Sequence, residues 1–146
     1  MKTMAIIEAG LIVNGLPILR RSYHPSVKDV DPMIKASLMT ALKTFAKEAF
    51  ADRPEVLKLS KFSIMLHDLN TEEPGTMFLY CVLEKKTAEG EVRRRLKQIE
   101  EKMAVMNEIL DQPVETKGLR KIKRLIDREL KDLCLRASDR AKNIFG

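Results

Sequence analysis

The 146-residue chain has no tryptophan, two tyrosines and two cysteines. The cysteines, Cys81 and Cys134, lie far apart and lack the short spacing of a zinc site, so the sequence predicts neither a structural metal nor a disulfide framework. Two buried thiols in a reducing compartment are the preferred interpretation. A disulfide between Cys81 and Cys134 is the alternative.

Long apolar runs are also missing. The apolar stretch near the N-terminus is interrupted by Glu8, Asn14, Gly15 and Pro17, and no later stretch is long enough to span a membrane. The sequence therefore predicts a cytoplasmic protein with neither a signal peptide nor a membrane span.

Catalytic and nucleotide-binding motifs are absent as well. The six glycines form neither a P-loop nor a dinucleotide-binding fingerprint. His67 precedes Asp68 at the end of a predicted strand, where adjacent side chains point to opposite faces, which disfavours a catalytic pair. We expect no catalytic residue, no cofactor and no metal, and an enzyme that uses His67 is the third hypothesis.

The chain does contain enough apolar material for one solid core. Apolar residues make up 45% of the sequence, and 146 residues suit a single domain. We expect one domain over residues 1–146, with a core over 1–112 and a basic C-terminal helix over 113–146.

Two apolar runs flank Asn14-Gly15, which predicts a hairpin with a two-residue turn because both residues tolerate positive φ. The turn sets the register, which places Glu8 opposite Arg21 as a structural cross-strand pair. Pro17 has no N–H to donate to a further strand, so residues 16–23 are predicted to form an edge strand.

A helix is predicted from Asp31-Pro32 to Phe50, because aspartate caps a helix and proline suits its first position. Apolar residues recur along it at helical spacing: Ile34, Leu38, Ala41, Leu42, Phe45 and Ala49.

Three more strands and two helices complete the predicted order. Residues 55–68 predict two strands, because the apolar alternation slips by one residue at Ser60-Lys61. Residues 76–83 form an unbroken apolar run, typical of a central strand buried on both faces. Helices are expected over 87–110 and from Thr116 onward. Their apolar stripes are Val92, Leu96, Ile99, Met103, Met106 and Leu110 in the first, and Leu119, Ile122, Ile126, Leu130, Leu133 and Ala137 in the second.

The net charge of +6 is carried by the end of the chain. Residues 117–146 contain ten basic and four acidic residues, so residues 1–116 are neutral overall. Basic residues that fall on one face of the last helix are Lys117, Arg120, Lys121, Arg124, Arg128 and Lys131. A smaller cluster at the start of the preceding helix contains Arg93 and Arg94, and the two clusters could merge if both helices share a face of the sheet.

Two interpretations of these basic clusters stay open. A solvated face of a docked helix is the simpler one. The functional one is contact with an anionic partner, either an acidic protein or anionic lipid, the latter at roughly 1 kcal/mol per basic residue. Nucleic acid is disfavoured because the basic segment has no interleaved aromatic residues.

Four blocks of the chain resemble the longin-like and roadblock-like superfamily, including its small single-domain archaeal members: GLIVNGLPILRRSY, DPMIKASLMTALKTFAKEAF, VLKLSKFSIMLHDL and MFLYCVLEKK. The resemblance covers roughly residues 4–110, and the last helix fits the longin pattern better. It implies an α+β fold of longin/profilin type. In that fold a five-stranded antiparallel sheet, in order 2-1-5-4-3 along the chain, carries the first helix on one face and the two last helices on the other.

The resemblance also implies a kind of function. Members of this superfamily typically have no enzymatic activity and act as homo- or heterodimeric platforms in small-GTPase regulation, vesicle trafficking or adaptor assemblies. Our leading hypothesis is therefore a non-enzymatic scaffold that binds a small GTPase or another longin-like or roadblock-like chain. The alternative is a peripheral binder of anionic membrane, or of nucleic acid, through the basic C-terminal helix.

Overall fold

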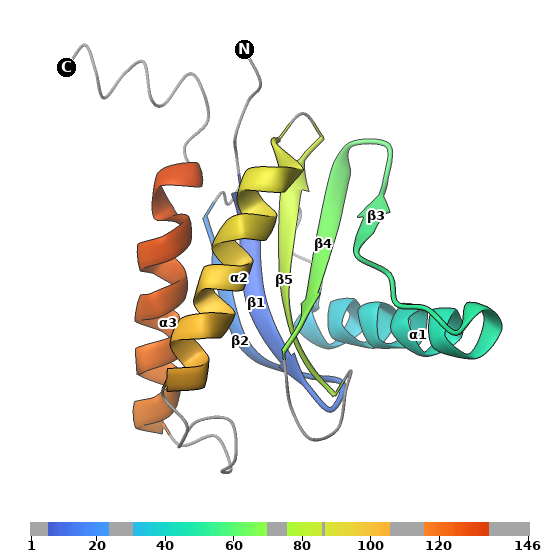
Figure 1. The fold of residues 1–146 in the computed structure, drawn as a ribbon, viewed down its shortest axis with the longest axis horizontal. Helices are drawn as coiled ribbons and strands as arrows, with labels where there is room; N and C mark the ends of the chain where they lie inside the picture. The colour runs from blue at the N-terminus through green and yellow to red at the C-terminus, as the bar shows by residue number, and fades with distance from the viewer. Residues whose placement is uncertain (1–5, 24–30, 70–75, 86, 106–115, 135–146) are drawn as a thin grey trace.

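The computed structural model describes residues 6–23, 31–69, 76–85, 87–105 and 116–134 (Figure 1). The elements are β1 (Ile6–Val13), β2 (Leu16–Ser22), α1 (Pro32–Phe50), β3 (Val56–Lys58), β4 (Phe62–Asp68), β5 (Met77–Glu84), α2 (Glu89–Val105), α3 (Thr116–Leu130) and a short 3₁₀ helix (Lys131–Leu133). The break between β3 and β4 falls where the apolar alternation slips, as predicted.

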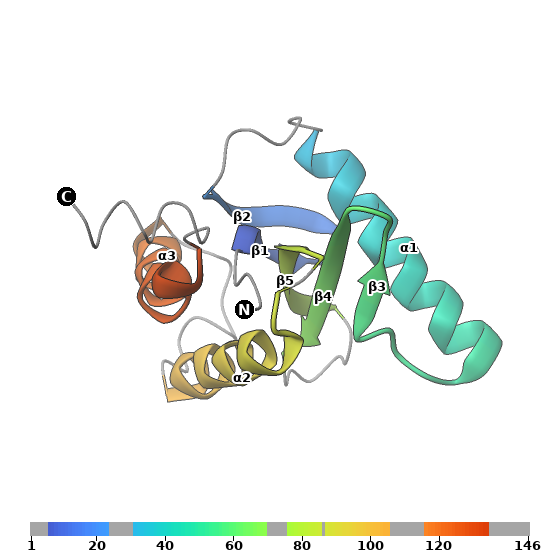
Figure 2. The same cartoon turned by 90° about the horizontal axis from the view of Figure 1, so that it is seen from above.

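One antiparallel sheet in the order β2-β1-β5-β4-β3 forms the middle of the molecule. Helix α1 covers one face, and α2 and α3 cover the other (Figures 1 and 2). The predicted α+β fold class, strand order and placement of the helices are therefore confirmed. No helix in the described part of the chain is long and apolar enough to cross a membrane.

The hairpin turn forms as predicted. Asn14 and Gly15 both have positive φ, of 51° and 79°, and β2 lies at the edge of the sheet. Pro17 is opposite Ile12, on the strand that has no further neighbour. The missing N–H of Pro17 thus costs the sheet no ladder hydrogen bond.

The predicted Glu8–Arg21 pair is wrong. Leu11 pairs with Leu19 while Ile12 pairs with Pro17, so Ile18 is an extra residue in β2 and forms a bulge. A bulge shifts every later residue by one position and moves its side chain to the other face.

As a result of the bulge, Glu8 is held by a different set of groups on the α1 face. Its carboxylate accepts hydrogen bonds from Arg20 Nε at 3.1 Å, Lys35 Nζ at 2.9 Å and Tyr80 Oη at 2.7 Å. Burial alone would raise the pKa of Glu8, but hydrogen bonds from Lys35, Tyr80 and Arg20 hold that pKa below its usual value. The structural interpretation of Glu8 therefore holds, with Arg20 in place of Arg21.

Arg21 lies on the opposite face and contacts α3. Its Nε donates to Asp127 Oδ1 at 2.9 Å, and Tyr23 Oη donates to the same oxygen at 2.8 Å. The edge strand is thus bound to the last helix by one carboxylate.

The two faces of the sheet carry separate apolar cores. The larger lies under α2 and α3, and the smaller lies under α1. The predicted stripes of α2 and α3 are buried except for Leu119, which is partly buried; Met106, Leu110 and Ala137 lie outside the described residues. Cys81 and Cys134 are buried thiols in the larger core and are not joined by a disulfide, so the prediction of two buried thiols is confirmed. Burial raises the pKa of both thiols.

Candidate functional site

Helix α1 begins as predicted: Asp31 caps it by accepting a hydrogen bond from the Met33 N–H at 2.9 Å, and Pro32 is its first residue. Its buried face, however, is made by Ala36, Met39 and Lys43. The apolar stripe that predicts the helix is therefore not the face that packs on the sheet.

The outer face of α1 carries large apolar side chains in solvent. We call four of them the α1 apolar surface: Ile34, Leu38, Phe45 and Phe50, with exposed fractions of 61%, 52%, 65% and 73%. The first three follow one another at i, i+4 and i+11, which places them on one side of the helix. The rings of Phe45 and Phe50 meet edge to face, with centroids 6.4 Å apart.

The C-terminal part of α1, which carries Phe45 and Phe50 of the α1 apolar surface, lies beside an edge of the sheet (Figure 2). Among the described residues, strand β3 pairs with β4 alone, so its outer edge has backbone groups that no other described strand pairs. The C-terminal part of α1 extends past β3 in the view from above (Figure 2). Leu59, which follows β3, is also exposed. An apolar helix face and an open strand edge thus lie next to each other, as at sites where proteins dock.

Sequence reasoning missed this surface because it treats an apolar stripe as the core-facing side of a helix. The signal was nevertheless present. A surface helix needs one apolar face, whereas α1 has apolar residues at two opposite positions of the helical turn, Leu38 and Phe45 on one side and Ala36 and Met39 on the other.

The basic residues predicted to contact an anionic partner lie on α3 and the following 3₁₀ helix. Those with exposed side chains, which we call the α3 basic surface, are Arg120, Lys121, Arg124, Arg128 and Lys131. None of the five forms an ion pair within the part of the chain that the structure describes. The side chain of Lys117 lies outside that description. Partner binding by these residues stays a prediction.

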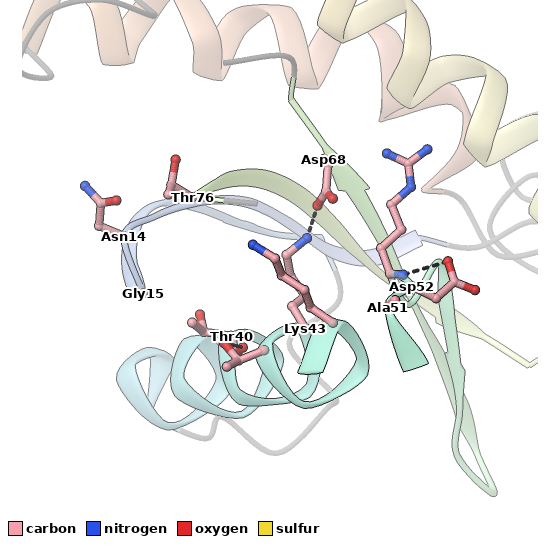
Figure 3. A pocket seen from close by; sticks show the side chains of 11 residues that line it. Asn14, Gly15, Thr40, Lys43, Ala51, Asp52, Asp68 and Thr76 are labelled. Carbon is pink, nitrogen blue, oxygen red and sulfur yellow. Dashed lines mark hydrogen bonds and ion pairs between the residues drawn. The ribbon is translucent and has the colours of Figure 1, made fainter. Parts of the chain in front are cut away.

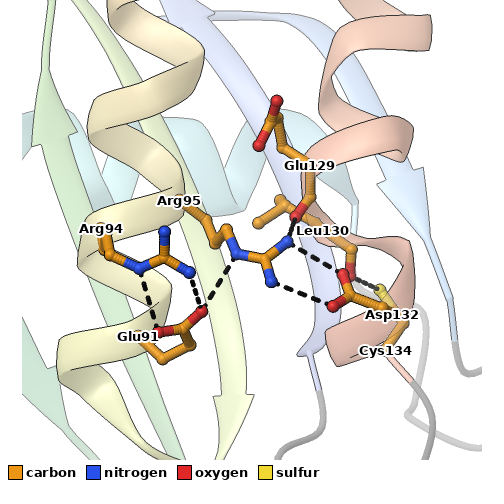
Figure 4. Close-up of polar contacts among 7 residues, drawn as sticks. All are labelled: Glu91, Arg94, Arg95, Glu129, Leu130, Asp132 and Cys134. Carbon is orange, nitrogen blue, oxygen red and sulfur yellow. Dashed lines mark hydrogen bonds and ion pairs between the residues drawn. The ribbon is translucent and has the colours of Figure 1, made fainter.

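Arg93 and Arg94 do not join the α3 basic surface. Arg93 pairs with Glu55, with 3.7 Å between the charged atoms, and Arg94 pairs with Glu91 (Figure 4). Acidic side chains thus offset both charges. Since α2 and α3 run antiparallel, these two arginines lie beside the end of α3, away from Arg120 (Figure 1).

The next arginine, Arg95, joins the two helices. Its guanidinium donates to both carboxylate oxygens of Asp132 at 3.0 Å and to the backbone carbonyl of Glu129 at 2.7 Å (Figure 4). Glu129 in turn pairs with Lys102 further along α2. These contacts fix α3 on α2 and leave the α3 basic surface facing outward.

His67 and Asp68 point to opposite faces, as predicted. His67 Nε2 lies 3.3 Å from Glu100 Oε1 on α2, whereas Asp68 pairs with Lys43 of α1. They cannot act as a catalytic pair. In the residues that the structure describes, no three His, Cys, Asp or Glu side chains gather as a group that could hold a metal ion.

Comparison with known proteins finds solved structures that are similar to this fold. No protein-family model and no curated protein matches the chain. Among solved structures, MglB of Myxococcus xanthus is 19% identical, with 75% of this chain and 83% of that chain covered and a TM-score of 0.53. A second MglB structure, described as having a tetrameric arrangement, is 17% identical, with coverages of 88% and 82% and a TM-score of 0.42. The similarity to the first of these structures shows that the chain has the longin/roadblock-like fold of MglB.

Proposed function

We propose that the protein is a non-enzymatic scaffold that joins protein partners in the regulation of a small GTPase. The observation that carries the proposal is the α1 apolar surface beside the open edge of β3. The class of partner rests on the longin/roadblock-like fold, since proteins of that superfamily act as platforms in small-GTPase regulation.

A second copy of this chain is the partner that we assign to the α1 apolar surface. A two-fold axis beside β3 would bring the same helix face and the same strand edge together from both copies, and such an arrangement closes on itself. It would cover Phe45 and Phe50 and pair the unpaired backbone groups of β3.

The α3 basic surface lies on the opposite side of the sheet and stays free in such a dimer (Figure 2). We assign it to an acidic surface of the small GTPase, because its five cations have no acidic partner among the described residues. A second candidate function, peripheral contact with anionic lipid, rests on the same five side chains.

A binding assay separates these possibilities. Small GTPases of the source organism, loaded with GDP or with a non-hydrolysable GTP analogue, are titrated onto the immobilised chain. We expect binding that depends on the nucleotide, and that falls about tenfold or more when Arg120, Arg124 and Arg128 are changed together to Glu. Lys97→Glu, on exposed α2 surface, is the matched control and should have no effect.

The alternative outcomes are equally distinct. Salt-sensitive binding to phosphatidylserine vesicles, lost in the triple variant, with no binding to any GTPase, supports the membrane function instead. Nucleotide-independent binding that survives the triple variant contradicts the role of the α3 basic surface.

A further inference from the structure

A polar pocket of about 550 Å³ lies at one end of the sheet. It is formed by the β1–β2 turn, the middle and end of α1, and the neighbouring ends of β4 and β5 (Figure 3). Three basic residues line it, Lys43, Lys47 and Arg53, together with two acidic residues, Asp52 and Asp68. The α1 apolar surface and the α3 basic surface use none of these side chains.

Lys43 is a buried cation in the wall of this pocket. Its side chain is 8% exposed, and its ammonium pairs with Asp68 and lies 4.7 Å from the centre of the Phe78 ring. Burial, followed by the nearby charge of Arg53, lowers the pKa of Lys43 to about 8, so the ammonium is still mostly charged at neutral pH. A second anion beside the ammonium would therefore be stabilised by it.

The charges of the other two basic side chains in the pocket, Lys47 and Arg53, are not neutralised by a described acidic residue. Neither Lys47 nor Arg53 forms an ion pair with any residue in the described ranges of the chain. The Asp52 carboxylate accepts a hydrogen bond from the Arg53 backbone N–H at 2.8 Å, and Asp68 is occupied by Lys43. The pocket thus has three cations against two carboxylates, and its unused groups are mainly hydrogen-bond donors.

Thr40 adds a buried hydroxyl under the hairpin turn. Its Oγ1 is buried and has no hydrogen-bond partner among the described residues. It lies close to the turn, since a Cβ placed on Gly15 would be 3.9 Å from that oxygen. Buried polar atoms without a partner are rare in native proteins and are costly to maintain, so this hydroxyl is a donor that a group bound in the pocket would satisfy.

We propose that this pocket binds a phosphomonoester of a small metabolite. The phosphate group lies among Lys43, Lys47 and Arg53 and accepts a hydrogen bond from the Thr40 hydroxyl. Phosphate suits this set because its oxygens are all strong acceptors and its charge is close to two at neutral pH. The volume is in the range of small-molecule sites, which leaves room for the organic part, and Asp52 can accept from its hydroxyl groups.

Amide NMR of the isotope-labelled full chain tests the proposal. AMP and glucose 6-phosphate are the probes, adenosine and glucose are their uncharged counterparts, and inorganic phosphate is a fifth arm. We expect saturable shifts at Gly15, Thr40 and Arg53 with both phosphomonoesters and none with the uncharged compounds. Equal shifts with adenosine or glucose, or no shifts with either phosphomonoester, would overturn the proposal.

Two variants test the residues. Thr40→Val keeps the size of the side chain and removes a hydroxyl that bonds to nothing in the described chain, so it should fold with a melting temperature at least as high as that of the wild type. Thr40→Val and Arg53→Gln should each weaken phosphomonoester binding about tenfold or more, as expected for lost hydrogen bonds to a charged group. Lys97→Gln, on the far side of the sheet, is the control. Unchanged affinity in both variants, or an equal loss in Lys97→Gln, would contradict the assignment.

This site does not depend on the proposed function. A chain that binds no GTPase and stays monomeric can still bind a phosphomonoester here, and the reverse also holds. The NMR titrations therefore test the pocket, and the GTPase-binding and sedimentation measurements test the proposed function, so either proposal can be contradicted without the other.

Discussion

The ring of Tyr80 lies directly against Gly10 of the neighbouring strand. A Cβ added at Gly10 would sit 2.5 Å from Tyr80 Cε1 and 2.5 Å from the Leu19 carbonyl oxygen. The absence of a side chain at this position lets Tyr80 reach across β1 and donate to Glu8. Gly10 is thus required for the buried hydrogen bonds that surround the Glu8 carboxylate.

Gly10→Ala should destabilise the fold, because both the Tyr80 ring and the Leu19 backbone must move. We expect a loss of about 2–4 kcal/mol in the free energy of unfolding, from overpacking together with the weakened Tyr80–Glu8 hydrogen bond. Urea denaturation measures it. Gly90→Ala is the control, since a Cβ there meets nothing within 4 Å. In α2 this change should be neutral or stabilising by up to about 1 kcal/mol. Equal effects of the two changes would contradict this role of Gly10.

Glu8→Gln should lower stability at neutral pH, because Arg20 and Lys35 lose their shared carboxylate. We expect the free energy of unfolding to fall by about 1–3 kcal/mol. This is less than for a fully buried ion pair, because both cations are partly exposed. The pKa of Glu8 is lower in the folded protein than its usual 4.5. Its contribution is therefore complete above that value and lost as the pH falls through the folded pKa.

Urea denaturation of wild type and Glu8→Gln from about pH 7 to about pH 3 checks this sign. The difference in the free energy of unfolding between the two proteins should become smaller as the pH falls. Glu101→Gln, on exposed α2 surface, should show no comparable difference at any pH. A gap between wild type and Glu8→Gln that stays constant down to the lowest pH would refute the electrostatic explanation.

Asp127→Ala should loosen the edge strand from α3, since Asp127 Oδ1 accepts from both Arg21 and Tyr23. Each bond is partly exposed, so we expect a total loss of about 1–2 kcal/mol. Amide hydrogen exchange should rise in β2 and stay unchanged in β4. A double-mutant cycle of Asp127→Ala with Tyr23→Phe should give losses that do not add, because both changes remove the same Tyr23–Asp127 hydrogen bond. Additive losses would show that Tyr23 and Asp127 do not interact.

Local signals predicted much of the fold. Asn14-Gly15 specified the hairpin, Asp31-Pro32 the start of α1, and the apolar run over 76–83 the central strand. In each case the chemistry of a few adjacent residues decides the structure. The bulge at Ile18 carries no such signal, because the residues around it fit a regular strand equally well. Because of that single extra residue, the partner of Glu8 is Arg20 and not the predicted Arg21.

The candidate sites were harder to predict for two physical reasons. A helical apolar stripe gives the period of a helix but not which side meets the sheet, so the exposure of Phe45 could not be inferred from spacing. The polar pocket joins Thr40 and Lys43 of α1 to the β1–β2 turn and to Asp68 at the end of β4, and only the tertiary fold brings these parts of the chain together. The α3 basic surface was predictable, because four of its five residues lie within α3 and the fifth, Lys131, directly follows it.

The proposed dimer, in which a second copy covers the α1 apolar surface, can be tested with one substitution. Phe45→Lys should separate the two copies without unfolding the chain, because Phe45 is exposed within one copy and packs on no core. Val105→Lys is a matched control, since Val105 is an exposed apolar residue at the end of α2, on the other face of the sheet.

Sedimentation velocity over a range of concentrations decides whether a second copy covers the α1 apolar surface. We expect wild type and Val105→Lys to sediment as dimers at micromolar concentration, and Phe45→Lys to sediment as a folded monomer with an unchanged circular dichroism spectrum. A wild-type chain that is monomeric at every concentration, or a Phe45→Lys variant that dimerises as tightly as wild type, would contradict the account.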